Sequence, residues 1–106
     1  MQQAGKTALV TGASAGLGKE FSRQLAAAGY RLVLVSRSQA PLDALAAELE
    51  AAHGTACIVV PADLSRAEAP AEIFAVLQEQ GVAVDYLVNN AGSAGPGLLR
   101  DRDWGA

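Results

Sequence analysis

The chain has 106 residues, of which 51% are hydrophobic and 18% charged, and its formal net charge is −3 at pH 7. This length suits one small domain over residues 1–106, and the eight scattered lysines and arginines form no basic stripe for nucleic acid. No apolar run approaches the roughly 18 residues of a membrane span, so no membrane partner is predicted.

A strand–turn–helix pattern comes first in the chain. An apolar run predicts a strand over residues 7–11, and helical spacing of apolar residues predicts a helix over residues 17–28. Gly29 supplies a stop for this helix. The predicted inner face of the helix carries Leu17, Phe21, Leu25 and Ala28.

Between this strand and helix lies a glycine-rich octet, residues 11–18, which predicts a phosphate cradle. Gly12 would allow a sharp turn, Gly16 would let a pyrophosphate approach the backbone, and Gly18 would let the helix lie close to the sheet. Free N–H groups at the helix start would face the phosphate charge. A plain strand–turn–helix without a ligand is the alternative. The residues predicted to contact a cofactor here are Gly12, Ala13, Ser14, Ala15, Gly16, Leu17 and Gly18.

The octet does not fit a Walker P-loop, because Gly18-Lys19 is followed by Glu20 where that motif needs serine or threonine. The tighter Gly-x-Gly-x-x-Gly fingerprint is absent too, since three residues separate Gly12 from Gly16.

The rest of the chain continues the alternation of strand and helix. Strands are predicted over residues 31–35, 56–60 and 86–88, and helices over residues 40–52 and 67–80. The order βαβαβαβ predicts an α/β fold with a parallel sheet and right-handed crossovers. Within these elements, Ser38 is a possible N-cap, Pro61 a strand stop, and Leu42, Leu45 and Leu49 an apolar stripe.

Two isolated residues favour structural interpretations. Cys57 cannot form an internal disulfide because it is the single cysteine, and its apolar surroundings predict a small buried hydrophobe. This use of cysteine suits a reducing cytoplasm. His53 is predicted to be a solvated surface residue, and no group of residues has metal-ligand spacing.

The residue after the second strand should read the adenosine ribose of a dinucleotide. An acid there would bind the 2′-hydroxyl of NAD, but this chain has Ser36-Arg37-Ser38. Arg37 would form charge-assisted bonds to a 2′-phosphate, so NADP is favoured over NAD. An ordinary exposed arginine is the alternative. Two further segments follow strands, Asp63-Leu64 and residues 89–92, and each alone would be interpreted as a turn.

Together, residues 11–18, 36–37, 63–64 and 89–92 resemble the short-chain dehydrogenase/reductase family. The resemblance implies the N-terminal part of a three-layer, doubly wound Rossmann-like fold with strand order 3-2-1-4. It implies that Asp63 and Leu64 contact the adenine, with Asp63 receiving its exocyclic amine. It also implies that Asn90, Ala91 and Gly92 border the cofactor ribose. NADP-preferring members often carry a basic residue where this chain has Ala15.

The catalytic Tyr-x-x-x-Lys pair of that family does not occur in the chain, because Leu34 and Asn90 stand four residues after the two tyrosines. We therefore expect the NADP-binding portion of an oxidoreductase, ending before its catalytic half, with no catalytic residue of its own. The full-length form would act on a carbonyl or alcohol, and its later helices would be needed for a homo-oligomer. The alternatives are a stand-alone, non-catalytic nucleotide-binding or regulatory module and a truncated product without a role.

Overall fold

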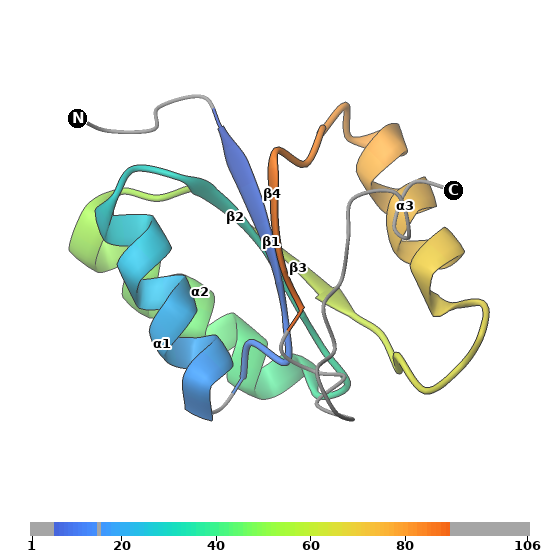
Figure 1. Cartoon of the computed structure of the whole chain (residues 1–106). Helices are drawn as coiled ribbons and strands as arrows, with labels where there is room; N and C mark the ends of the chain where they lie inside the picture. The colour runs from blue at the N-terminus through green and yellow to red at the C-terminus, as the bar shows by residue number, and fades with distance from the viewer. Residues whose placement is uncertain (1–5, 15, 90–106) are drawn as a thin grey trace.

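A computed structural model describes residues 6–14 and 16–89 of the chain (Figure 1). Strands and helices alternate along these residues, and the strands all pair in parallel in the order β3-β2-β1-β4. The elements are β1 (Thr7–Thr11), α1 (Gly16–Ala27), β2 (Arg31–Ser36), α2 (Gln39–His53), β3 (Cys57–Pro61), α3 (Ala69–Glu79) and β4 (Tyr86–Asn89).

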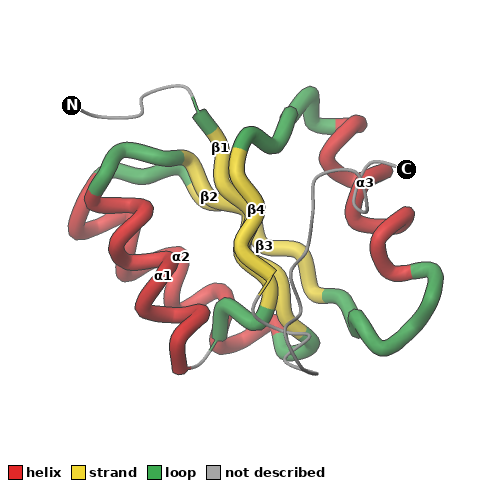
Figure 2. The backbone as a smooth tube through the Cα atoms, in the orientation of Figure 1, coloured by secondary structure: helices red, strands yellow, loops and turns green. Residues whose placement is uncertain are grey.

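The sheet forms the middle of three layers. Helices α1 and α2 lie side by side on one face of the sheet, and α3 lies on the other (Figures 1 and 2). This arrangement and the strand order confirm the predicted doubly wound fold.

The two central strands are buried on both faces, which explains their continuous apolar sequence. In β1, Ala8 and Val10 pack into the cluster beneath α1 and α2, whereas Leu9 packs into the cluster beneath α3. In β2, Leu34 and Val35 likewise join opposite clusters, and all five side chains are fully buried. Alternate residues of each strand therefore serve opposite halves of the core.

Helix α2 has the apolar face that the sequence predicts. Leu42, Leu45 and Leu49 are at most 1% exposed and join the cluster beneath the helix. Gly54 ends the helix in a left-handed conformation with φ 67°, and its N–H donates to the carbonyl of Glu50 at 2.9 Å. Ser38 stands at the N-cap position, but its side chain makes no capping hydrogen bond.

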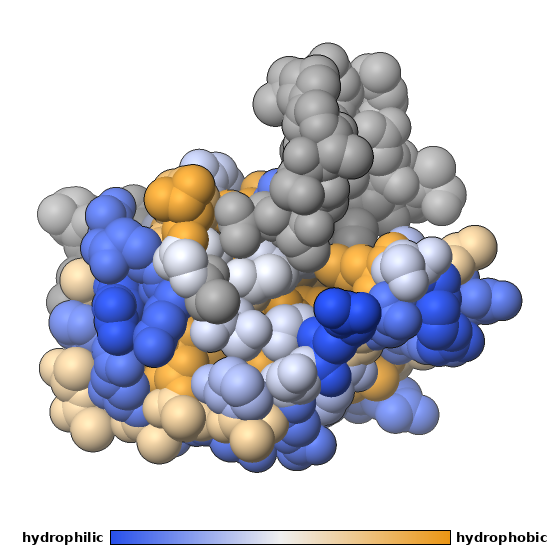
Figure 3. Space-filling model, turned by 90° about the horizontal axis from the view of Figure 1, so that it is seen from below, coloured by the Kyte–Doolittle hydropathy of each residue, from blue (hydrophilic) through white to orange (hydrophobic). Residues whose placement is uncertain are grey.

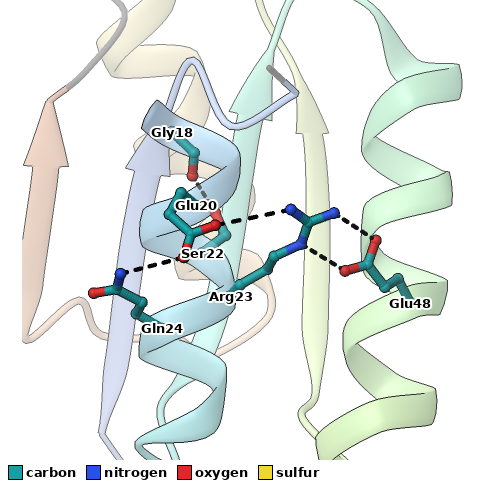
Figure 4. Close-up of polar contacts among 6 residues, drawn as sticks. All are labelled: Gly18, Glu20, Ser22, Arg23, Gln24 and Glu48. Carbon is teal, nitrogen blue, oxygen red and sulfur yellow. Dashed lines mark hydrogen bonds and ion pairs between the residues drawn. The ribbon is translucent and has the colours of Figure 1, made fainter. Parts of the chain in front are cut away.

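Helix α1 shows that one prediction about its inner face was wrong. Leu17 is 67% exposed and Phe21 is 39% exposed, while Gly18, Ser22 and Ala26 are buried. Small residues four positions apart let a helix backbone lie close to a sheet, and this stripe forms the inner face together with the half-buried Leu25, the one predicted leucine that packs against the core. The buried Ser22 hydroxyl has a hydrogen-bond partner within the helix, because it donates to the Gly18 carbonyl at 2.8 Å (Figure 4).

The two neighbouring helices are also joined at their surface. The Arg23 guanidinium on α1 donates to both carboxylate oxygens of Glu48 on α2, at 2.7 and 3.2 Å (Figure 4). The hydrogen bond from Arg23 lowers the pKa of Glu48. Because both side chains are exposed, we expect this pair to contribute little to the stability of the fold.

Other elements differ from prediction mainly at their ends. Strand β3 includes Pro61, which is paired with Ser36, so the proline is the last residue of the strand instead of the first beyond it. Helix α3 begins at Ala69, two residues later than predicted, with Pro70 in its first turn.

Cys57 is half-buried, and burial raises the pKa of its thiol to about 11, as suits an inert residue. His53 is exposed at the end of α2.

Candidate functional site

A groove of about 400 Å³ opens at the edge of the sheet where the parallel strands end. Three segments far apart in the sequence meet there because their strands, β1, β2 and β3, are neighbours. Figure 3 views the molecule from this side, where pale, weakly polar surface lies between more strongly coloured flanks. The lining residues are Gly12, Ser14, Ser36, Arg37, Ser38, Ala62, Asp63, Leu64 and Ser65.

The glycine-rich turn forms the β1 side of the groove. Gly12 and Gly16 adopt left-handed backbone conformations, with φ values of 64° and 56°, which other residues adopt only with strain. A Cβ on Gly16 would meet no atom within 4 Å, so conformation and not crowding calls for glycine there. The buried Ala13 donates its N–H to the Val35 carbonyl at 3.2 Å. This bond fastens the turn to β2.

The end of β2 contributes an exposed positive charge. Arg37 follows the strand directly and makes no ion pair with any residue in 6–14 or 16–89. The adjacent Ser36 hydroxyl donates to the Ser38 carbonyl at 3.3 Å, which shapes the backbone on both sides of the arginine. A cation without a carboxylate partner beside a groove is suited to bind an anionic group.

The end of β3 contributes a fixed carboxylate. Asp63 Oδ1 accepts two hydrogen bonds from Ser65, from its N–H at 2.9 Å and from its hydroxyl at 2.6 Å. These bonds lower the pKa of Asp63, and the positive charges of Arg37 and Arg66 lower it further. Arg66 is itself held by Glu72 through two contacts of 3.1 Å.

Ser65 was not among the residues predicted for the site. The sequence carried a signal for it, because an aspartate followed two positions later by a backbone N–H and a hydroxyl is typical of a side-chain-closed turn. The Asp-Leu-Ser order therefore indicates the turn, although not its place beside Arg37.

The groove brings together five of the predicted site residues, namely Gly12, Ser14, Arg37, Asp63 and Leu64. Ala13 is buried behind them, and Gly16, Leu17 and Gly18 lie at the start of α1 outside the groove lining. Ala15, Asn90, Ala91 and Gly92 lie outside the described residues.

Beside the groove, β1 and β4 are tied together at their carboxyl ends. The Thr11 hydroxyl donates to Asn89 Oδ1 at 3.0 Å, and Asn89 immediately precedes the predicted ribose-binding residues. The asparagine side chain thus joins the first glycine turn to the last described strand.

None of the helices in residues 6–14 and 16–89 is both long enough and apolar enough to cross a membrane.

Both the sequence and the fold of the chain are similar to those of a known family. Residues 6–104 match the short chain dehydrogenase family. The chain belongs to this family. Its members are oxidoreductases, and the relatives of this chain include named reductases and dehydrogenases.

Three relatives illustrate the similarity of this short-chain dehydrogenase family member. A very-long-chain 3-oxoacyl-CoA reductase of Neurospora crassa is 44% identical over 109 aligned residues, which cover 93% of this chain and 31% of the relative. The structure of L-sorbose reductase from Gluconobacter frateurii, complexed with NADPH and L-sorbose, has a TM-score of 0.81 at 29% identity and covers 98% of this chain and 41% of that one. An alcohol dehydrogenase from Thermococcus sibiricus, complexed with 5-hydroxy-NADP, has a TM-score of 0.73 at 36% identity over 77% of this chain and 35% of that one.

The chain spans about a quarter to a third of the length of the curated relatives that it matches. The shared region therefore includes the edge of the sheet that carries the groove and leaves most of each relative outside the comparison.

Proposed function

We propose that this chain forms an NADP-binding Rossmann domain of a short-chain oxidoreductase. The observation that carries the proposal is the exposed Arg37 at the end of β2, which forms no ion pair within residues 6–14 and 16–89 and shares a groove with the glycine turn. A carboxylate at this place would favour the 2′-hydroxyl of NAD, whereas a guanidinium forms charge-assisted bonds with a 2′-phosphate. The complexes of two structural relatives with NADPH and 5-hydroxy-NADP support the same cofactor class.

The residues of the groove, together with the start of α1, fit the adenosine and pyrophosphate parts of such a cofactor. The left-handed glycines let the backbone approach a pyrophosphate, and the start of α1 offers N–H groups and the positive end of a helix dipole. Arg37 would hold the 2′-phosphate, with Ser14 beside it in the lining. Asp63 and Leu64 would contact the adenine, and Asp63 Oδ2 takes no part in the two bonds from Ser65.

The reaction of the whole protein, in this proposal, is hydride transfer between the nicotinamide and a carbonyl or alcohol. The cofactor would give a hydride to a carbonyl or accept one from an alcohol, and this chain would bind and orient the cofactor. A 3-oxoacyl-CoA, named for the Neurospora crassa relative, is one member of the proposed substrate class. Because the 106 residues contain no Tyr-x-x-x-Lys, we propose cofactor binding without turnover for this chain by itself. Its cytoplasmic location stays a prediction.

Titration calorimetry of the chain with NADPH and with NADH tests the proposal. We expect saturable binding of both, with NADPH tighter. Arg37→Ala should weaken NADPH about tenfold or more and leave NADH nearly unchanged, because it removes charged hydrogen bonds to the phosphate alone. Arg37→Asp should shift the preference toward NADH.

Arg31→Ala is the matched control, because Arg31 is an exposed arginine at the opposite end of the same strand. It should leave both affinities unchanged. An unaltered ratio of NADPH to NADH affinity in the Arg37 variants would show that Arg37 is an ordinary surface residue. Absence of saturable binding of either cofactor to the folded chain would refute the proposed function.

A further inference from the structure

Arg37 and Asp63 present opposite charges in the same groove, yet they do not pair. Both residues line the groove, and the charge of Arg37 contributes to the lowered pKa of Asp63, after the two larger contributions from Ser65. Within residues 6–14 and 16–89, no ion pair joins the two side chains. Arg37 is exposed and Asp63 is half-buried, and the charge of Arg37 acts on the carboxylate without a direct contact between the described side chains.

The reason lies in what already holds the carboxylate. Ser65 donates two hydrogen bonds to the same oxygen, Asp63 Oδ1, and the 2.6 Å hydroxyl contact is short. The backbone on the other side of Asp63 is fixed as well, because the Ala62 N–H donates to the Ser36 carbonyl at 2.8 Å. Asp63 is thus held at the β3 end of the groove by the hydrogen bonds of Ser65 to its side chain and of Ala62 to the Ser36 carbonyl.

We propose that Ser65 is a positioning residue that keeps Asp63 away from Arg37, and so keeps the guanidinium available for the 2′-phosphate of the cofactor. This inference rests on the proposed function. Without the Ser65 hydroxyl, the carboxylate gains freedom to reach the guanidinium and competes with the phosphate for it. Loss of an adenine contact would weaken NADPH and NADH equally, whereas this competition weakens NADPH alone. The ratio of the two affinities therefore isolates the effect of Ser65 on Arg37.

The test is calorimetric titration of the full chain with NADPH and NADH. Ser65→Ala should reduce the preference for NADPH about tenfold, the size expected for interfering with a charged hydrogen bond. Ser65→Thr, which retains the hydroxyl, should keep the wild-type ratio. The double variant Ser65→Ala with Asp63→Asn should restore the ratio, because the neutral amide no longer attracts the guanidinium.

Asp63→Asn alone provides a measurement that does not depend on the alanine variant folding. It should keep or raise the preference for NADPH, and a fall would overturn the proposal. Equal weakening of both cofactors by Ser65→Ala would also overturn it, because Ser65 would then act on the adenine contact only. Failure of the double variant to restore the ratio would have the same meaning. If the wild-type chain binds neither cofactor, the proposed function itself fails, which is a distinguishable result.

Discussion

Helices α1 and α2 lie side by side on the same face of the sheet, yet they bury opposite kinds of residue. Beneath α2 lies a row of leucines, whereas α1 contacts the sheet through glycine, serine and alanine and leaves Leu17 and Phe21 largely exposed. Larger side chains of α1 instead border a hollow over the last strand, lined by Phe21, Gln24, Leu25, Tyr86, Leu87 and Val88. The difference shows that a helix can approach a sheet through its smallest residues while some of its larger apolar side chains stay outside the core.

The largest expected effect comes from the buried leucine face of α2. Leu45→Ala should lower the free energy of unfolding by about 2–5 kcal/mol, because the leucine is 1% exposed and its removal leaves a cavity in the core. Urea unfolding followed by circular dichroism measures the change. Asp43→Ala, an exposed position on the same helix, should change stability little. A loss below about 1 kcal/mol for Leu45→Ala would contradict the buried role of this face.

The small-residue face of α1 should respond to added volume instead of lost volume. Ala26→Leu should destabilise the fold by about 1–3 kcal/mol, because Ala26 is 2% exposed against the sheet and the helix would have to move outward. The same unfolding measurement applies. Ala27→Leu, one position along on the exposed side, is the control. Equal stability of the two leucine variants would mean that α1 has room beneath it.

The smallest effect is expected on the exposed stripe of α1. Leu17→Ser should change the free energy of unfolding by no more than about 0.5 kcal/mol, since the side chain is 67% exposed. Thermal unfolding of this variant beside the wild type is the measurement. A loss of about 2 kcal/mol or more would indicate that the stripe is covered after all, and that the two helices are alike.

The sequence predicted the architecture well where burial on both faces left a plain pattern. The prediction that the apolar runs of β1 and β2 and the leucines of α2 are buried was correct, because only a position in the core accounts for such patterns. The prediction for the inner face of α1 was wrong at Leu17 and Phe21, because periodicity counts apolar residues. Close packing against the sheet instead selects small residues such as Gly18 and Ser22.

In the candidate site, the positions of the two charged residues, Arg37 and Asp63, could be predicted from the sequence. Arg37 and Asp63 follow predicted strands, and the parallel sheet brings those strand ends to one edge. The role proposed for Ser65 could not be predicted from the sequence, because it rests on two hydrogen bonds to one carboxylate oxygen that only the folded chain shows.

The lining of the groove comes from the segments that follow β1, β2 and β3, and β4 contributes none of it among the described residues. The adenosine end of the proposed site is therefore built by three of the four described strands, without β4. Relatives that share this segment are named for different substrates, a sugar and an acyl-CoA ester, so the same strand ends accompany more than one chemistry.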